Sequence, residues 1–303
     1  MSVLVVGSVA LDSIENMYGK KDDILGGSAS FASYASSFFS TTNIVGIVGD
    51  DFPQKYLDLF ASKNIDVEGL HRAEGKTFRW GGKYRHDMVH RDTLFTELGV
   101  FDKFNPVLPE SYKNSEYVLL ANIQPELQLQ VLNQMSQPDL VATDTMNLWI
   151  NTVLEELHEV IRRSDMLFLN DEEARQLTGK VNLTEAAEAL MDMGPKTVII
   201  KRGEHGASLH TDNDYFFVPS YPVARVFDTT GAGDTFAGAM LGYLATCKNI
   251  DKNALRLSMV LGTVLASFTV EDFSLDALAK IEEHSIKERV EAIRKSVLFD
   301  EYM

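Results

Sequence analysis

Residues 228–236 read DTTGAGDTF and are followed by an apolar, Ala-rich segment, residues 237–244. The small residues at 231–233 allow the backbone to turn tightly and leave its N–H groups accessible to a ligand. The apolar segment predicts a buried helix, so the small residues lie at its positive N-terminal end. Free N–H groups and the helix dipole both favour an anion at such an end. The stretch therefore predicts an anion site.

Asp234 lies within this predicted site, where a bound anion would repel its carboxylate. A kinase resolves this conflict, because the amides hold the transferring phosphoryl group while the aspartate accepts the proton of the attacking hydroxyl. The alternative is a Gly-rich loop with an acidic cap on an ordinary core helix. That alternative would be preferred for a lone pair of glycines, because short glycine motifs are common.

The complete run from 228 to 234 resembles the C-terminal signature of the ribokinase-like (PfkB) family of sugar and nucleoside kinases. The resemblance extends over nearly the whole chain. It implies an ATP-dependent kinase that requires Mg²⁺. In such an enzyme Asp234 would be the general base, and the amides of Gly231, Ala232 and Gly233 would form the anion hole.

Composition and segment order predict the fold class. The chain has 303 residues, of which 45% are hydrophobic, enough for one large α/β domain or two smaller ones. The apolar run at residues 3–7 is typical of a strand buried on both faces of a parallel sheet. Further strands are expected at 43–48, 117–121, 140–143, 166–169 and 197–201, and helices at 28–39, 53–62, 125–135, 150–161, 172–177 and 183–193. This alternation predicts a doubly wound, mostly parallel α/β sandwich, a single kinase domain over residues 1–303.

The segment from Lys76 to Leu94 interrupts this alternation. Aromatic and basic residues alternate in it with a period of two, which predicts an extended strand with one aromatic and one basic face. The family resemblance implies that segments of about 12–25 and 73–97 pair as a small β-sheet lid. The aromatic face would pack on the substrate or on the lid of a second copy, giving a homodimer.

Two further strand ends carry candidate nucleotide-binding residues. Asn170 and Glu173 match an Asn-x-x-Glu motif that in the family organises Mg²⁺ through water, although an ordinary helix cap gives the same pattern. The turn after residues 197–201 supplies candidate phosphate-binding residues, which are Lys201, Arg202, Gly203 and Gly206. Asp144 and Asn147 follow another strand end and are expected to face the same crevice.

The candidate acceptor-binding residues lie nearer the N-terminus. Asp12 resembles the family residue that binds substrate hydroxyls, and Gly26 and Gly27 resemble its Gly-Gly motif. Phe31 occupies a position where the family often has Asn, and its ring is expected to stack on the acceptor, as is Trp80. Such stacking favours a nucleoside kinase as the alternative to a sugar kinase, and the basic residues leave a sugar phosphate as a third possibility.

Ions, partners and location complete the set of expectations. Asp228 and Thr230 occupy positions where some family members bind a monovalent cation such as K⁺. The formal net charge of −16 argues against nucleic acid as a partner. The single cysteine, Cys247, is consistent with a cytoplasmic protein, and no stretch is long enough to cross a membrane. A non-catalytic binding module of the same fold is the least favoured alternative.

Overall fold

Strand β1 (Ser2–Val6) shows how the apolar N-terminal run builds two cores at once. Its side chains alternate between the two faces of the sheet. Val3 and Val5 belong to one buried cluster, and Leu4 and Val6 belong to another on the opposite face. The run is therefore apolar throughout because both faces of the strand are covered. The computed structural model describes residues 1–88 and 90–298, so residue 89, inside the predicted segment 73–97, and residues 299–303 lie outside the description.

The main sheet contains ten strands and is mostly parallel. Its order is β14-β13-β12-β11-β10-β9-β1-β4-β5, with β6 pairing to β4, and only the β12–β13 and β13–β14 pairs are antiparallel. The bounds of the other strands are β4 Thr41–Gly49, β5 Ile65–Asp66, β6 Leu70–Ala73, β9 Tyr117–Leu120, β10 Leu140–Asp144, β11 Met166–Asn170, β12 Thr197–Lys201, β13 Ala207–Thr211 and β14 Asp214–Val218. The predicted doubly wound α/β sandwich is confirmed.

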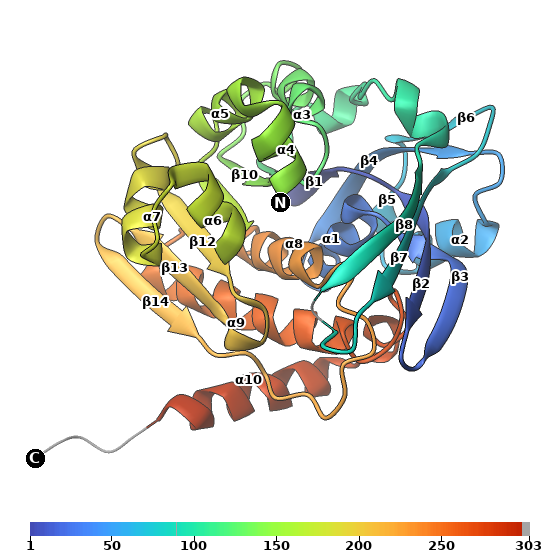
Figure 1. Ribbon diagram of the computed structural model, residues 1–303. Helices are drawn as coiled ribbons and strands as arrows, with labels where there is room; N and C mark the ends of the chain where they lie inside the picture. Colours follow the sequence, from blue (N-terminus) through green and yellow to red (C-terminus); the bar gives the residue numbers. More distant parts are fainter. Residues whose placement is uncertain (89, 299–303) are drawn as a thin grey trace, which may run out of the picture.

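Helices cover both faces of this sheet (Figure 1). The helices are α1 Ser28–Ser36, α2 Gln54–Ser62, α3 Pro125–Leu132, α4 Asn147–Thr152, α5 Leu154–Arg162, α6 Asp171–Thr178, α7 Leu183–Met191, α8 Ala232–Leu244, α9 Lys252–Thr269 and α10 Glu283–Val297. Helices α1, α8 and α9 pack in the cluster that contains Val3, whereas α3 to α7 cover the other face. The helix expected at 150–161 is interrupted at Val153, whose backbone is not helical. Within the described part of the chain, no helix is both long and apolar enough to cross a membrane.

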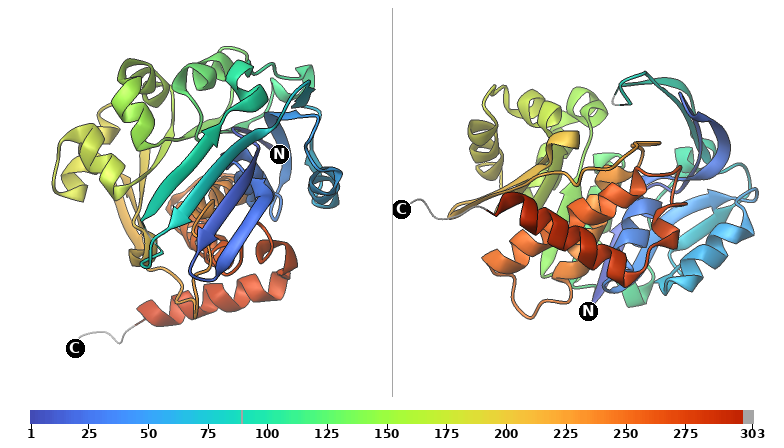
Figure 2. Two further views of the ribbon diagram at one scale, coloured as in Figure 1. Left: turned by 45° about the vertical axis from the view of Figure 1, so that its right-hand side comes forward. Right: turned by 90° about the horizontal axis from the view of Figure 1, so that it is seen from below.

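A separate sheet of four strands is built from β2 (Ala10–Asn16), β3 (Gly19–Gly26), β7 (Phe78–Tyr84) and β8 (Arg91–Glu97) in the order β3-β2-β7-β8. We call it the small sheet, and Figure 2 shows its strands side by side. β8 is its exposed edge strand, and Leu94, Phe95 and Leu98 are each at least 37% exposed there and just beyond its end. Dimerisation through this sheet stays a prediction.

The prediction of one extended strand from Lys76 to Leu94 is wrong, because the chain reverses direction in the middle of this segment. The amide of Met88 donates to the carbonyl of Arg85 at 3.0 Å, and Met88 has a positive φ of 57°. This turn folds β8 back against β7, so that Arg91 lies opposite Tyr84. Residues directly opposite in an antiparallel pair share a face. Arg91 is consequently on the aromatic face and not on a basic one.

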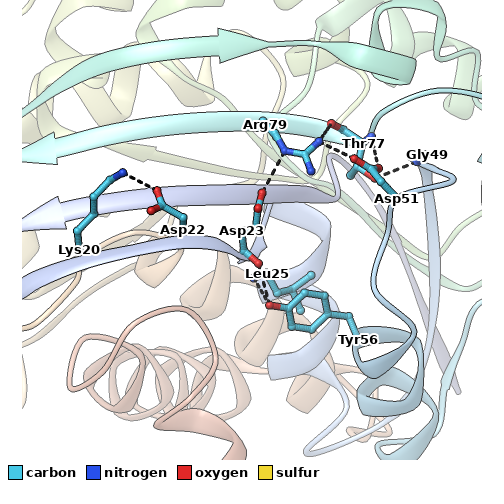
Figure 3. Close-up of polar contacts among 9 residues, drawn as sticks. All are labelled: Lys20, Asp22, Asp23, Leu25, Gly49, Asp51, Tyr56, Thr77 and Arg79. Atoms are coloured by element: carbon cyan, nitrogen blue, oxygen red, sulfur yellow. Dashed lines mark hydrogen bonds and ion pairs between the residues drawn. The ribbon is translucent and has the colours of Figure 1, made fainter.

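Polar contacts fix the small sheet to the main body (Figure 3). Arg79 forms ion pairs with Asp23 of β3, at 3.1 Å, and with Asp51, at 2.7 Å. Asp51 also accepts hydrogen bonds from the amide and the hydroxyl of Thr77, each at 2.8 Å. The hydroxyl of Tyr56 on α2 donates to the carbonyl of Asp23 at 3.2 Å. Arg79 therefore joins β7 to its neighbours.

Helices α1 and α8 cross with backbone atoms in close contact. A Cβ atom at Gly238 would clash with the backbone of Ala32, and one at Gly242 would lie 2.6 Å from the carbonyl oxygen of Ser36. Real Cβ atoms do not approach backbone atoms this closely, so the crossing requires glycine at both positions.

We predict that Gly238→Ala destabilises the protein. Alanine contributes about 1 kcal/mol of helix propensity, but the added methyl group forces α1 and α8 apart, and overpacking of this kind costs about 1–3 kcal/mol. Thermal and denaturant unfolding should show a net decrease in the free energy of unfolding. The exposed Lys248→Ala variant serves as the control, with an expected change within about 0.5 kcal/mol. Unchanged or increased stability of Gly238→Ala would contradict this account of the crossing.

Candidate active site

The N-terminus of α8 carries the predicted anion site. Gly231 is the N-cap residue with φ of 76°, and among the described residues no side chain caps the helix. The amides of the first turn of a helix have no intrahelical acceptor, so those of Gly233 and Asp234 lack one here. They combine with the positive end of the helix dipole to favour an anion.

The Phe31 ring of α1 packs directly against the turn at Gly231. A Cβ atom at Gly231 would clash with the Phe31 ring, so the ring fills the space that a side chain at 231 would need. Phe31 is only 1% exposed. It therefore presents no ring face to the crevice in this conformation, and the expected stacking surface for an acceptor is not found at Phe31.

Asp234 lies in the first turn of α8 and is partly exposed, so its carboxylate is not sealed in the core. Desolvation, together with repulsion from Asp144, raises the pKa of Asp234 to about 6, although Lys201 opposes the shift. A carboxyl group with this pKa is mostly ionised at neutral pH and is more basic than an ordinary aspartate. These properties suit a general base.

Lys201, the last residue of β12, lies beside the anion site. Its Nζ atom forms an ion pair with Asp144 Oδ2 at 2.7 Å, and the two side chains are 18% and 6% exposed. A Cβ atom at Gly233 would be 3.2 Å from the same Nζ. Parallel strands place their carboxyl ends at one edge of the sheet, so β10 and β12 bring Asp144 and Lys201 together at the mouth of α8.

Asn170 and Glu173 form a complete capping box at the start of α6. Asn170 Oδ1 accepts a hydrogen bond from the amide of Glu173, and Glu173 Oε2 accepts one from the amide of Asn170, both at 2.8 Å. Burial raises the pKa of Glu173 to about 7, while Lys201 opposes the shift. The geometry fits both the helix-cap interpretation and the Mg²⁺-binding hypothesis. The cap uses only one of the two Glu173 carboxylate oxygens, and the carboxylate lies near Lys201.

The predicted acceptor-binding residues are centred on Asp12, in β2. Asp12 is 5% exposed, and burial with repulsion from Asp228 and Asp234 raises its pKa to about 8. A Cβ atom at Gly26 would overlap the Asp12 carboxylate, and Gly27 has φ of 93°. The Gly-Gly pair thus leaves room for the carboxylate at the junction between β3 and α1.

Asp228 is buried next to the same turn. Its Oδ1 atom accepts a hydrogen bond from the amide of Thr230 at 2.9 Å. Its Oδ2 atom has no hydrogen-bond partner in the described part of the chain, and burial raises the pKa of this carboxyl group. An unpaired buried carboxylate oxygen is a suitable ligand for a small cation.

The small sheet contacts the signature turn directly. The hydroxyls of Tyr84 and Thr230 are hydrogen-bonded at 2.8 Å, and Asn16 Nδ2 donates to the carbonyl of Phe227 at 2.5 Å. Trp80 lies opposite Asp12 in the register of β2 and β7, so the two residues share a face. The sequence pattern predicted Tyr84 on the substrate-facing aromatic side, but it placed Arg91 on the opposite face.

The remaining predicted residues lie at the edge of this cluster. Gly203 and Gly206 shape the turn after β12, with φ of 54° and 89°, and the Arg202 guanidinium lies 5.9 Å from the Phe217 ring centroid. Asn147 begins α4 and is exposed. The structure brings Asp12, Asp144, Glu173, Lys201 and Asp234 close enough for their charges to interact.

Comparisons with known proteins identify the family to which this fold belongs. Residues 2–281 match the family described as pfkB family carbohydrate kinase. The chain is 30% identical to a cytidine kinase of Thermococcus kodakarensis over 251 residues, which cover 80% of this chain and 88% of the relative. The chain belongs to the pfkB family of carbohydrate kinases.

Solved structures show the same fold. The nucleoside kinase of Methanocaldococcus jannaschii has a TM-score of 0.75 and 22% identity, with 96% of this chain and 98% of that chain covered. Arabidopsis thaliana ribokinase, complexed with ribose and ATP, has a TM-score of 0.77 and 18% identity, with 95% and 98% covered.

We predict that Lys201→Met destabilises the protein more at high pH than at low pH. The folded-state pKa values of Glu173 and Asp234, about 7 and about 6, lie above the unfolded values of about 4. Folding therefore takes up protons, and this contribution to stability is lost as pH rises through the folded pKa values. Removing the lysine raises both pKa values further and extends the loss to higher pH.

Melting temperatures measured at pH 5.5 and pH 8 test this expectation, with the difference from wild type larger at pH 8. Lys196→Met is the matched control, because Lys196 lies just before β12 but its side chain is 84% exposed. A pH-independent difference for Lys201→Met would show that Lys201 does not neutralise these carboxyl groups.

Proposed function

We propose that the protein transfers the γ-phosphoryl group of ATP to a hydroxyl of a sugar or sugar-like acceptor. One observation carries the proposal, which is the partly exposed Asp234 carboxylate beside the uncapped amides of α8. Amides at a helix N-terminus stabilise the charge of a transferring phosphoryl group, and removing such a donor typically costs about 10²–10³ in rate. The adjacent Asp234 carboxylate would take the proton of the attacking hydroxyl.

In the proposed reaction the acceptor oxygen attacks the γ-phosphorus in line with the leaving group. The new O–P bond forms as the bond to the bridging oxygen of ADP breaks. Asp234 takes the proton of the attacking hydroxyl, and Lys201, with Arg202 and the turn at Gly203 and Gly206, neutralises phosphate charge. The amides at 231–233 would hold the transferring group, and the Ala232 amide would first have to leave the Thr229 carbonyl, to which it donates at 3.3 Å.

Bound Mg²⁺ would offset the negative charge of the triphosphate. Mg²⁺ commonly keeps several waters and few protein carboxylates, so Glu173 and Asn170 suit a water-mediated role. The unpaired Oδ2 of Asp228 supports a separate monovalent cation near Thr230, such as K⁺.

The small sheet would act as the lid over the acceptor. Asp12, Gly26 and Gly27 would bind acceptor hydroxyls next to Asp234. A closed lid excludes water, which otherwise competes with the acceptor and hydrolyses ATP. The hydrogen bond between the hydroxyls of Tyr84 and Thr230 supports this role, because it joins the proposed lid to the turn that would hold the phosphoryl group.

A nucleoside acceptor is the second candidate. Trp80 shares a face of the small sheet with Asp12, so a ring attached to a ribose bound at Asp12 would lie toward the indole. The similarity to proteins named cytidine kinase and nucleoside kinase favours the same class.

We predict that Asp234→Asn abolishes turnover while ATP binding remains largely intact. The amide preserves the size of the side chain but cannot accept the hydroxyl proton, and loss of a general base typically costs about 10²–10⁴ in rate. Coupled ADP-release kinetics and calorimetric titration with ATP measure the two properties separately. The exposed Asp212→Asn variant should behave as wild type. Substantial phosphorylation by Asp234→Asn would rule out the assignment.

The pKa of Asp234 also predicts the acidic limb of the pH–rate profile. The base acts in its ionised form, so kcat/KM should fall about tenfold per pH unit below a pH of about 6. Initial rates between pH 4.5 and 8, at constant ionic strength, provide the measurement. A flat profile from pH 5 to pH 7 would be incompatible with a base of this pKa.

A further inference from the structure

On the face of the small sheet that carries Asp12, the Trp80 indole lies between the backbone at Gly82 and the Arg91 guanidinium. The Trp80 indole lies across Gly82, where a Cβ atom would clash with it, and the Arg91 guanidinium lies 5.4 Å from the indole ring centroid. The indole nitrogen donates to Thr93 Oγ1 at 3.4 Å. We call these four residues the Arg91 ledge. Because one face of the indole lies on the strand and the other is near Arg91, the outermost layer is the guanidinium.

The register of the sheet places the Arg91 ledge above the acceptor side. Trp80 lies opposite Asp12, and Arg91 lies opposite Tyr84, whose hydroxyl contacts Thr230 of the signature turn. The charge of Arg91 also lowers the pKa values of Asp12, Asp228 and Asp234, in agreement with this placement.

Arg91 differs from other arginines of the same sheet. Arg79 pairs with Asp23 and Asp51, and Arg85 pairs with Asp92 at 2.6 Å. Arg91 is exposed, and across residues 1–88 and 90–298 its side chain forms no hydrogen bond or ion pair; its guanidinium contacts the Trp80 ring. A guanidinium that is supported on one face and unpaired at its edge is available to a ligand.

The surroundings restrict the chemistry of that ligand. The Asp234 carboxyl group, which is mostly ionised at neutral pH, would repel a second phosphate on the acceptor, which argues against an acceptor that is already phosphorylated. A planar guanidinium stacks on aromatic rings and donates hydrogen bonds to carbonyl oxygens. Both properties fit a neutral, electron-rich heteroaromatic ring better than a free sugar.

We infer that the Arg91 ledge binds the base of a nucleoside acceptor. This inference rests on the proposed kinase function. The ribose lies at Asp12, its reactive hydroxyl reaches Asp234, and the base extends along the small sheet to the Arg91 guanidinium. Trp80 acts as a positioning residue that holds Arg91, which revises its expected role as the stacking surface itself.

The test compares Arg91→Gln with Arg85→Gln, which removes the same charge from a paired arginine of the same sheet. Kinetics with ATP and a panel of cytidine, uridine, adenosine, inosine, ribose and ribose 5-phosphate measure the effect. Contacts of this kind correspond to about a fivefold to thirtyfold change in affinity, the larger value when the bound ring excludes water from the contact. We expect Arg91→Gln to raise KM for nucleosides by this factor with little change in kcat, and Arg85→Gln to stay within about twofold of wild type. Arg91→Lys, which keeps the charge but not the plane, should show the same loss.

Three outcomes would overturn the inference. The first is an equal effect of Arg91→Gln and Arg85→Gln on nucleosides. The second is a loss confined to ribose 5-phosphate, which would assign Arg91 to an anion. The third is a wild-type enzyme that phosphorylates ribose but no nucleoside, a result that leaves the kinase function intact. Absence of turnover on the whole panel would count against the inference and the proposed function together, and retained turnover by Asp234→Asn would count against the proposed mechanism alone.

Discussion

Lys201 offsets the negative charge of the carboxyl groups gathered at the N-terminus of α8, and the candidate site depends on this interaction. The carboxyl ends of β10 and β11 and the first turns of α6 and α8 gather Asp144, Glu173 and Asp234 in a poorly hydrated region. Carboxylates that are buried together repel each other and lose hydration. The lysine offsets both effects through its ion pair with Asp144. The same ammonium group is close enough to the α8 amides to act on a bound anion.

The two sheets meet where the chain leaves β1 and enters β2. This continuity places Asp12 within a few residues of the main core while its side chain faces the signature turn. Ser8 and Ser28 stabilise the junction through reciprocal hydrogen bonds, because each amide donates to the hydroxyl of the other at 3.0–3.1 Å. The Asp12 carboxyl group therefore lies close to the main body, whereas Arg91 and Thr93 of the Arg91 ledge lie on β8, the edge strand of the small sheet.

Much of the fold follows from the sequence because the strongest signals are local. The apolar runs of β1 and β12 are long enough to exclude exposed positions, and the expected bounds of β12 agree with the structure. The turn at Met88 was missed because its sequence contains neither glycine nor proline and the alternation continues through it. That omission placed Arg91 on the wrong face. The burial of Phe31 and the pairing of Lys201 with Asp144 depend on contacts between distant segments, which a single sequence does not encode locally.

Phe31 and Gly231 belong to different helices, one on the acceptor side and one on the phosphate side, yet they occupy a single shared volume. A larger residue at 231 would require a smaller one at 31, so the two positions form a size-matched pair. Relatives that carry a small polar residue in place of this ring would have to fill or hydrate the space behind the turn. The proposed acceptor and phosphate sites are thereby linked by the packing of Phe31 against Gly231, and a change of substrate during evolution would be expected to involve both positions.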